Sequence, residues 1–276
     1  MPYSAEISRV NPGCFIFLLD QSGSMSDTMA QGQKRKSDVV ADSLNRLLME
    51  LSIKCAKEEG VRDYFQVAVI GYGARVGPAL QGTLSGQDIV QLSEIASNPL
   101  RVEQRAKKVD DGAGGVIEQT IKLPVWIEPS HNGGTPMSQA LKAAFNIAHT
   151  FVTNHPDCFP PVVLNLTDGE ATDGDPSVAA AEIRSLASSD GNALLFNLHI
   201  STAGSPIIFP DSDSMLTDKF ARQLFEMSSM LPAPMCSYAA QQGVQTSQST
   251  RGFVFNADIV AVVQFLDIGT RATDLR

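Results

Sequence analysis

The sequence has few cysteines, a shortage of basic residues and no long apolar run, and each of these argues against a class of protein. Its 276 residues include only four cysteines, Cys14, Cys55, Cys158 and Cys236. None belongs to a C-x-x-C pair, and no histidine stands beside them at zinc spacing, so the pattern indicates neither a zinc site nor a disulfide framework. We expect Cys14 and Cys55 to be small core residues in a protein of a reducing compartment.

The charge balance is acidic, with 30 Asp and Glu against 21 Lys and Arg and a formal net charge of −9. Nucleic-acid binding is not supported, because it calls for a basic patch. The basic run Lys34-Arg35-Lys36 is expected to be solvated surface or a helix entry. No apolar run approaches the roughly 20 residues of a membrane helix, and residues 1–10 lack the pattern of a secretion signal. We therefore expect a cytoplasmic protein without a membrane segment.

Continuous apolar runs alternate with amphipathic segments along most of the chain. Apolar runs of strand length predict buried strands, and apolar residues at helical spacing predict helices with one buried face. The pattern predicts an α/β fold, a doubly wound, mostly parallel sheet flanked by helices on both faces. The expected strands are 14–19, 64–72, 160–169, 193–200 and 251–256, with a short edge strand within 75–84. The expected helices are 36–58, 87–96, 136–152, 175–188, 214–230 and 258–269.

Two segments interrupt this alternation within what we expect to be a single domain, 1–276. Residues 97–134 are too long for a simple connection, and the turn-like "DDGAG" between two strand-like stretches predicts a projecting β-hairpin insertion at 97–128. Trp126, in the second strand of this hairpin, either packs the hairpin onto the domain or anchors a partner. Residues 231–250 are polar and rich in small side chains, and we expect a loop there.

A cluster of oxygen-bearing side chains follows the first strand, in "FIFLLDQSGSMSD" (15–27). Asp20, Ser22 and Ser24 alternate along the chain, so a loosely extended segment would turn all three toward one point. Such hard oxygen ligands suit Mg²⁺ or Mn²⁺, or Ca²⁺ with a larger shell. Taken alone, the stretch is also compatible with a polar turn and a helix cap.

Two further loops are expected at the same edge of the sheet, because ligands of doubly wound folds bind outside the carboxyl ends of the strands. The loop "HNGGTPMS" contains Thr135 directly before a helix, and "LNLTDGE" places Asp168 directly after a core strand. Thr135 alone could cap the helix, and Asp168 alone could belong to an ordinary turn. All three loops together predict a metal site.

The motifs D-x-S-x-S, G-G-T-P and strand-T-D-G, in this order, resemble those of the von Willebrand factor A (VWA) domain. The resemblance covers about residues 12–270, apart from 97–128, which is not part of a minimal domain. It implies a Rossmann-like fold and a metal-ion-dependent adhesion site formed by Asp20, Ser22, Ser24, Thr135 and Asp168. In this family the hydroxyls usually coordinate a divalent cation directly, while the aspartates often act through water.

The same resemblance implies a metal-dependent protein–protein interaction module that binds an acidic side chain of its partner. The expected cation is Mg²⁺ or Mn²⁺, and Ca²⁺ is less expected. The chain is most similar to the intracellular bacterial members, whose partners include ATPase, kinase and phosphatase components.

The alternative is an enzyme, a magnesium-dependent phosphohydrolase or phosphotransferase. Ser22 stands where an aspartyl-phosphate enzyme typically has its second acid. The sequence contains neither G-x-x-x-x-G-K-[ST] nor G-x-S-x-G, and its lysines lie away from the predicted rim loops. We therefore expect a protein that is not an enzyme.

Overall fold

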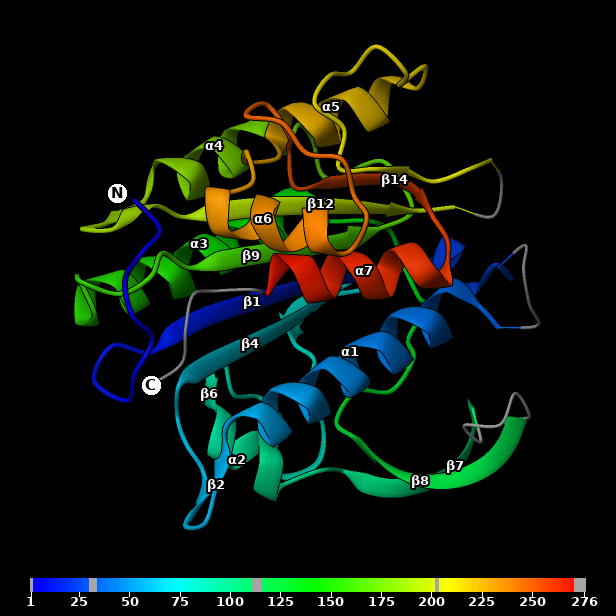
Figure 1. Ribbon diagram of the computed structural model, residues 1–276. Coiled ribbons are helices and arrows are strands. Elements are labelled where there is room, and N and C mark those ends of the chain that lie inside the picture. Colours follow the sequence, from blue (N-terminus) through cyan, green and yellow to red (C-terminus); the bar gives the residue numbers. More distant parts are fainter. Residues whose placement is uncertain (1, 30–33, 111–115, 202–203, 271–276) are drawn as a thin grey trace.

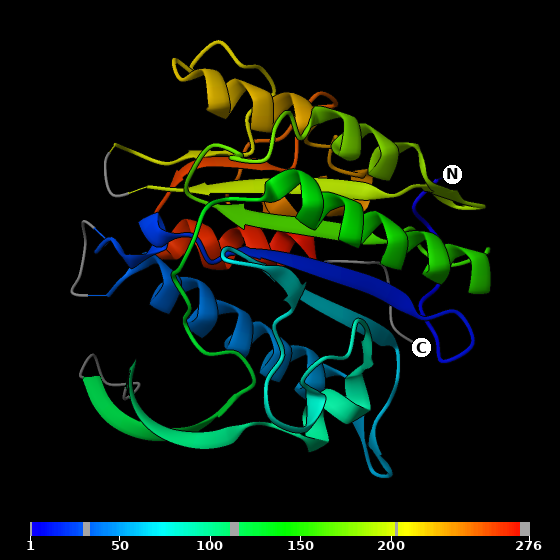
Figure 2. The same ribbon diagram turned by 180° about the vertical axis from the view of Figure 1, so that it is seen from behind.

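The computed structural model describes residues 2–29, 34–110, 116–201 and 204–270, which form a central sheet with helices on both faces (Figures 1 and 2). Five adjacent strands run parallel. In spatial order they are β14 (Phe253–Ala257), β12 (Leu194–Ile200), β9 (Val162–Thr167), β1 (Gly13–Asp20) and β4 (Phe65–Tyr72). The predicted doubly wound α/β fold is confirmed.

Short antiparallel strands complete the two edges of this sheet. At one edge, β13 (Ile207–Ile208) pairs with β14. At the other, β5 (Val76–Pro78) and β6 (Val90–Gln91) both pair with β4. Short elements off the sheet include the hairpins β2–β3 (Ala56–Lys57, Gly60–Val61) and β10–β11 (Ala187–Ser188, Gly191–Asn192), and the 3-10 turn η2 (Gly82–Leu84).

The winding of the sheet reverses beside β1. The chain leaves β1 for β4 on one side and later returns to place β9 on the other side of β1. In open α/β sheets, ligands bind at the carboxyl ends of the strands where the strand order reverses. The ends of β1 and β9, Asp20 and Thr167, therefore lie at the expected binding edge.

Strand β1 shows why these segments are strands, because all eight of its side chains are buried. Phe15, Phe17 and Leu19 point into one core cluster, while Ile16 and Leu18 point into the cluster on the opposite face. A run that is apolar on both faces is stable only between two helical layers.

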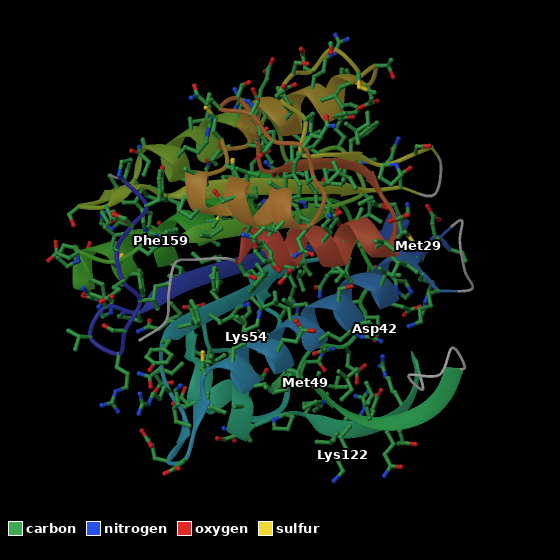
Figure 3. The ribbon with its side chains drawn as sticks, in the orientation of Figure 1. Met29, Asp42, Met49, Lys54, Lys122 and Phe159 are labelled. Carbon is green, nitrogen blue, oxygen red and sulfur yellow. The ribbon has the colours of Figure 1, made fainter. Side chains whose placement is uncertain are left out.

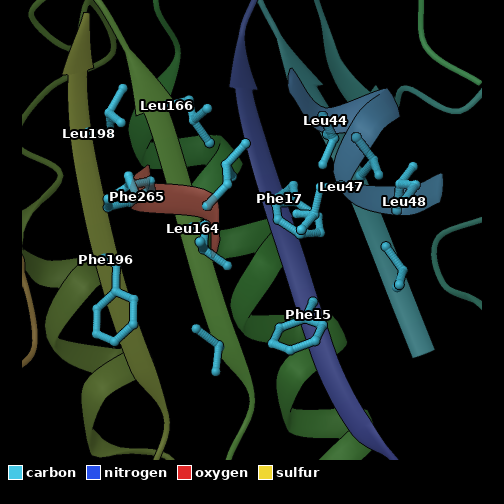
Figure 4. Close-up of a cluster of buried hydrophobic side chains, with 14 of the residues drawn as sticks. Phe15, Phe17, Leu44, Leu47, Leu48, Leu164, Leu166, Phe196, Leu198 and Phe265 are labelled. Carbon is cyan, nitrogen blue, oxygen red and sulfur yellow. The ribbon is translucent and has the colours of Figure 1, made fainter. Parts of the chain in front are cut away.

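The helices form those two layers. One face is covered by α1 (Lys36–Lys54), α2 (Leu92–Ser97), α6 (Ala233–Gln241) and α7 (Ile259–Gly269). The other is covered by α3 (Met137–Asn154), α4 (Ser177–Ser185) and α5 (Lys219–Met227). Figure 4 shows Leu44 and Leu48 of α1 against Phe17 of β1. Burying each leucine contributes roughly 1.5–3 kcal/mol, so this face anchors α1 beside the binding edge.

Strands β7 (Arg101–Asp110) and β8 (Val116–Val125) form a curved ribbon that leaves the body of the domain (Figures 1 and 2). Of the described strands, these two pair only with each other. Most of the predicted "DDGAG" turn lies outside the described residues. An ion pair links the middle of β7 to α1, because Nη1 of Arg105 lies 2.7 Å from Oδ1 of Asp42. Figure 3 labels Asp42 on α1 and Lys122 on β8.

Trp126 follows β8 and is 1% exposed. Its Nε1 donates to the carbonyl oxygen of Ile95 at 2.6 Å. The side chain therefore packs the hairpin onto α2. Of the two roles considered for Trp126, packing the hairpin and anchoring a partner, the structure shows the first.

Several sequence predictions differ from the structure. The helix expected at 87–96 starts at Leu92, because Val90 and Gln91 pair with β4 as β6. The helix expected at 175–188 ends at Ser185, because the chain turns into the β10–β11 hairpin. Residues 231–250 include the helix α6, because buried Met235 and Ala239, one turn apart, pack this short segment against the core beside α7. The first helix ends at Lys54, since the chain turns into the β2–β3 hairpin. The fifth helix is shorter than 214–230 because Asp218 caps it, accepting from the backbone nitrogens of Phe220 and Ala221.

All four cysteines are free thiols, and Cys14 and Cys55 are buried core residues as expected. Among the described residues, no helix has both the length and the apolar character needed to cross a membrane.

Candidate metal-binding site

Three loops meet at the carboxyl edge of β1 and β9. They are the turn after β1, which includes η1 (Gly23–Ser26), the segment before α3 and the segment after β9. The first two are joined where the Gly23 nitrogen donates to the Gly133 carbonyl oxygen at 3.0 Å. The second and third are joined where the Thr172 nitrogen donates to the Thr135 carbonyl oxygen at 2.9 Å. Backbone hydrogen bonds thus fix the relative positions of the loops.

Asp20, the last residue of β1, is 2% exposed. Its Oδ1 accepts from the Ser22 nitrogen at 2.8 Å, and its Oδ2 accepts from the Thr167 hydroxyl at 2.7 Å. Burial raises the pKa of Asp20; hydrogen bonds from Ser22 and Thr167 oppose this shift, and the negative Asp168 adds to it. Ionised Asp20 is therefore costly in the protein alone, and a cation beside it would offset that cost.

A chain of hydroxyl contacts leads from this turn to the third loop. The hydroxyl oxygens of Ser22 and Ser24 lie 3.1 Å apart, and the Ser24 hydroxyl donates to Oδ1 of Asp168 at 2.7 Å. Ser22 is buried, whereas Ser24 is exposed. These contacts bring four of the five predicted residues together: Asp20, Ser22, Ser24 and Asp168.

Thr135 belongs to the second loop and is 5% exposed. The Thr135 nitrogen donates to the Thr172 hydroxyl at 2.9 Å, and the Thr135 carbonyl oxygen accepts from the Thr172 nitrogen. Gly133 allows the loop to approach the segment after β4, because its φ is +92° and a Cβ there would lie 2.4 Å from the Ala74 nitrogen. Among the contacts of the described residues, Thr135 is thus linked to the other four only through its loop, while those four contact one another directly.

Two neighbouring side chains in "QSGSMS" are engaged outside this cluster of contacts. Met25 is fully buried in the core. The Ser26 hydroxyl donates to the Gly23 carbonyl oxygen at 2.8 Å, within η1. Ser26 is thus engaged in the turn itself.

Lys36 is a residue of this edge that the sequence analysis missed, and the expectation that the lysines lie away from the rim was wrong. Its ammonium lies 2.8 Å from Oδ2 of Asp168 and 3.2 Å from Oδ2 of Asp27. The Lys36 side chain is 8% exposed and that of Asp168 is 0% exposed. In the sequence, Lys36 looks like its solvated neighbours Lys34 and Arg35, and only the start of α1 beside η1 and the segment after β9 turns it inward.

Thr167 and Asp173 were missed as well. Thr167 precedes Asp168 in the T-D-G motif, and it orients Asp20. Asp173 accepts from the backbone nitrogens of Ser138 and Gln139 at 3.0 and 2.9 Å, so it caps the first turn of α3. The alternation of side-chain direction along β9 could have indicated that Thr167 points into the protein. No sequence signal links Asp173 to α3, which precedes it in the chain.

The side chains at this edge offer hard oxygen donors: two carboxylates, of Asp20 and Asp168, and the hydroxyls of Ser22, Ser24 and Thr135. Within the described ranges, no group of three or more His, Cys, Asp or Glu side chains is arranged to hold a metal. The chemistry available here therefore suits a hard divalent cation such as Mg²⁺ or Mn²⁺, not a soft one.

Comparisons with known proteins found structural likeness only. No family model and no curated protein matches the sequence. The pilus adhesin SpaC from Lactobacillus rhamnosus GG matches with a TM-score of 0.51 and 14% identity over 96% of this chain and 31% of its own. The manganese-loaded TRAP protein of Plasmodium vivax has a TM-score of 0.44 and 14% identity, over 93% and 72% of the two chains.

A third match is VWA2, the ArnB paralogue from Sulfolobus acidocaldarius, with a TM-score of 0.34 and 14% identity. It covers 69% of this chain and 35% of that structure. The chain thus spans about a third of both the SpaC and VWA2 structures. At this identity the likeness concerns the fold alone.

Proposed function

We propose that the chain is a protein-interaction module of the VWA type, built on the doubly wound sheet described above, and that its binding to a partner depends on a divalent cation. Asp20, Ser22, Ser24, Thr135 and Asp168 would hold the cation, Mg²⁺ or Mn²⁺. The observation that carries the proposal is geometric: the buried carboxylate of Asp20, held by the Ser22 nitrogen and the Thr167 hydroxyl, lies beside the contacting hydroxyls of Ser22 and Ser24. A divalent cation is the ligand that suits such a set of oxygens.

The residues of the chain would divide the work. The bound cation would act as a Lewis acid that accepts a carboxylate oxygen from the partner. Thr167 and the Ser22 nitrogen orient Asp20, and the Ser24 hydroxyl orients Asp168. Because three of the five residues are neutral hydroxyls, much of the cation's charge stays available to the partner.

The net charge of −9 would repel an acidic partner at long range, so recognition depends on the cation and on local contacts. A cytoplasmic location, and a partner that is an ATPase, kinase or phosphatase component, are also part of this proposal. Both rest on the resemblance in the sequence alone. We treat residues 1–276 as one domain with the hairpin inserted within 97–128, also as a proposal.

The competing proposal is a magnesium-dependent phosphohydrolase or phosphotransferase, with Asp20 as the nucleophile. Both carboxylate oxygens of Asp20 accept hydrogen bonds, from Ser22 and from Thr167, which reduces their nucleophilicity. Ser22 also supplies no second carboxylate for acid–base work. The geometry therefore supports a non-enzymatic module better.

Calorimetric titration with MnCl₂ tests the site. We expect binding by the unmodified protein, and its loss in Asp20→Ala and Ser22→Ala. Ser26→Ala is the matched control, since Ser26 lies in the same turn but contacts only the Gly23 carbonyl there. Equal binding by all four proteins would end the assignment.

A capture experiment with and without EDTA then tests the interaction. We expect EDTA and Asp20→Ala to release the captured partner, and Ser26→Ala to retain it. Capture that ignores EDTA would rule out the cation as the bridge. Phosphate release from generic phosphate esters that disappears in Asp20→Asn would favour the enzyme instead.

A further inference from the structure

Lys36, the first residue of α1, directs its charge inward although it starts a helix at the surface. Its side chain is 8% exposed, and its ammonium lies 2.8 Å from Oδ2 of Asp168. The ammonium also lies 3.2 Å from Oδ2 of Asp27, but the Asp27 side chain is 60% exposed, which weakens this second contact. Asp168 is therefore the principal buried partner of this ammonium.

Asp168 depends on this contact, because its side chain is completely buried. One carboxylate oxygen accepts from the Ser24 hydroxyl and the other contacts Lys36. A hydroxyl carries no net charge, so Lys36 supplies the compensation that a buried carboxylate requires.

The two neighbouring basic residues are used elsewhere. Lys34 pairs with Asp42 at 2.5 Å, and its side chain is 53% exposed. Arg35 pairs with Asp38 at 3.1 Å within the first turn of α1. One of three successive cations thus serves the candidate metal site, and Lys34 provides a matched control for it.

We propose that Lys36 is a built-in counter-charge that limits the affinity of this site for divalent cations. The inference rests on the proposed function, since it concerns the same site. In the absence of a cation, the ammonium pairs with Asp168 and orients its carboxylate. When a cation binds, the same ammonium is a like charge beside a ligand residue, and their repulsion opposes binding.

The size of this effect follows from the burial of the pair. Exposed charges a few ångström apart are largely screened, but a pair with side chains 8% and 0% exposed is screened much less. Removing a single positive charge at this range should tighten cation binding on the order of tenfold or more. The lysine thus keeps the cation exchangeable, which suits an interaction that assembles and dissociates.

Two kinds of measurement test the proposal: titration calorimetry with MnCl₂ and thermal unfolding with and without MnCl₂. The proteins are the unmodified chain, Lys36→Met, Lys36→Arg and Lys34→Met. We expect Lys36→Met to bind Mn²⁺ about tenfold more tightly, and Lys36→Arg and Lys34→Met to stay within about twofold of the unmodified chain. Without Mn²⁺, Lys36→Met should melt at a lower temperature than Lys34→Met, and Mn²⁺ should raise its melting temperature more.

Equal or weaker Mn²⁺ binding by folded Lys36→Met, with binding intact in the unmodified chain, would overturn the role of Lys36 alone. Absence of binding in every variant would overturn the proposed cation dependence, and the counter-charge with it. If Lys36→Met does not fold without the cation, Lys36→Gln, which keeps a polar end, replaces it in the same comparison. We expect Lys36→Gln also to bind Mn²⁺ about tenfold more tightly than the unmodified chain. If its affinity equals that of the unmodified chain, the proposal is overturned.

Discussion

The hydroxyl of Thr167 donates a hydrogen bond to Oδ2 of Asp20 at 2.7 Å, across the junction between β9 and β1. Both residues are buried, and each is the last residue of its strand. The bond therefore ties the orientation of a proposed ligand to the pairing of two parallel strands.

Thr167→Val should destabilise the protein and weaken the site. The substitution keeps the shape but leaves Oδ2 of Asp20 without this donor, which costs about 1–3 kcal/mol in the free energy of unfolding. Because the donor also orients Asp20, Mn²⁺ binding should weaken about tenfold. Urea unfolding and calorimetric titration measure the two effects.

Thr150→Val is the control for this prediction. Its hydroxyl donates to the Asn146 carbonyl oxygen on an exposed turn of α3. We expect a change below about 0.5 kcal/mol and unaltered Mn²⁺ binding. Equal effects in the two variants would show that Thr167 has no special role at the site.

The burial of Asp20 predicts an unusual dependence of stability on pH. Burial raises the pKa of Asp20 in the folded protein above that of the unfolded chain. Its contribution to stability is then fully present at low pH, below the unfolded pKa, and is lost as the pH rises through the folded pKa. In chelator, the unmodified protein should therefore lose stability relative to Asp20→Asn as the pH rises from about 4.

Parallel denaturant titrations of the two proteins at several pH values measure this difference. Saturating Mn²⁺ should remove the loss for the unmodified protein and leave Asp20→Asn unchanged. A stability difference that is independent of pH would mean that burial does not disfavour the ionised form of Asp20.

The architecture and the grouping of the three loops could be predicted from the sequence, because the determinants are local or topological. Continuous apolar runs such as residues 14–19 become buried parallel strands only between helical layers. Parallel strands then bring Asp20 and Asp168 to one edge, although they are far apart in the chain.

The inward turn of Lys36 and the helix α6 could not be predicted, because both depend on tertiary contacts. Three successive basic residues look alike in sequence, and the one that reaches Asp168 is selected by how α1 starts beside η1. Helix α6 has only two buried apolar residues, Met235 and Ala239, and its stability comes from its packing against the rest of the core.

Asn45 holds the end of the β7–β8 ribbon to α1, and its removal should loosen the ribbon. Its side chain is 2% exposed, donates to the Ile127 carbonyl oxygen and accepts from the nitrogens of Trp126 and Ile127. Asn45→Ala leaves these three backbone groups unpaired, so we expect a loss of about 2–4 kcal/mol in the free energy of unfolding. Proteolysis in the ribbon should also become faster than in the unmodified protein.

Asn98→Ala serves as the comparison, because Asn98 makes a single hydrogen bond to the exposed Glu94 carbonyl oxygen. It should cost less than about 1 kcal/mol and leave proteolysis of the ribbon unaltered. If Asn45→Ala behaves in the same way, the ribbon is held by Trp126 and the Arg105–Asp42 ion pair without help from Asn45.

Gly133 predicts that the second loop tolerates no side chain. Its φ of +92° is unfavourable for other residues, and an added Cβ would lie 2.4 Å from the Ala74 nitrogen. Gly133→Ala should therefore destabilise the protein by about 1–3 kcal/mol. It should also displace the loop that carries Thr135, and Mn²⁺ binding should fall by more than stability alone explains.

Gly77→Ala is the matched control in β5, since its Cβ would meet nothing within 4 Å. Intact Mn²⁺ binding in folded Gly133→Ala would mean that the close approach of this loop to the segment after β4 does not position the site.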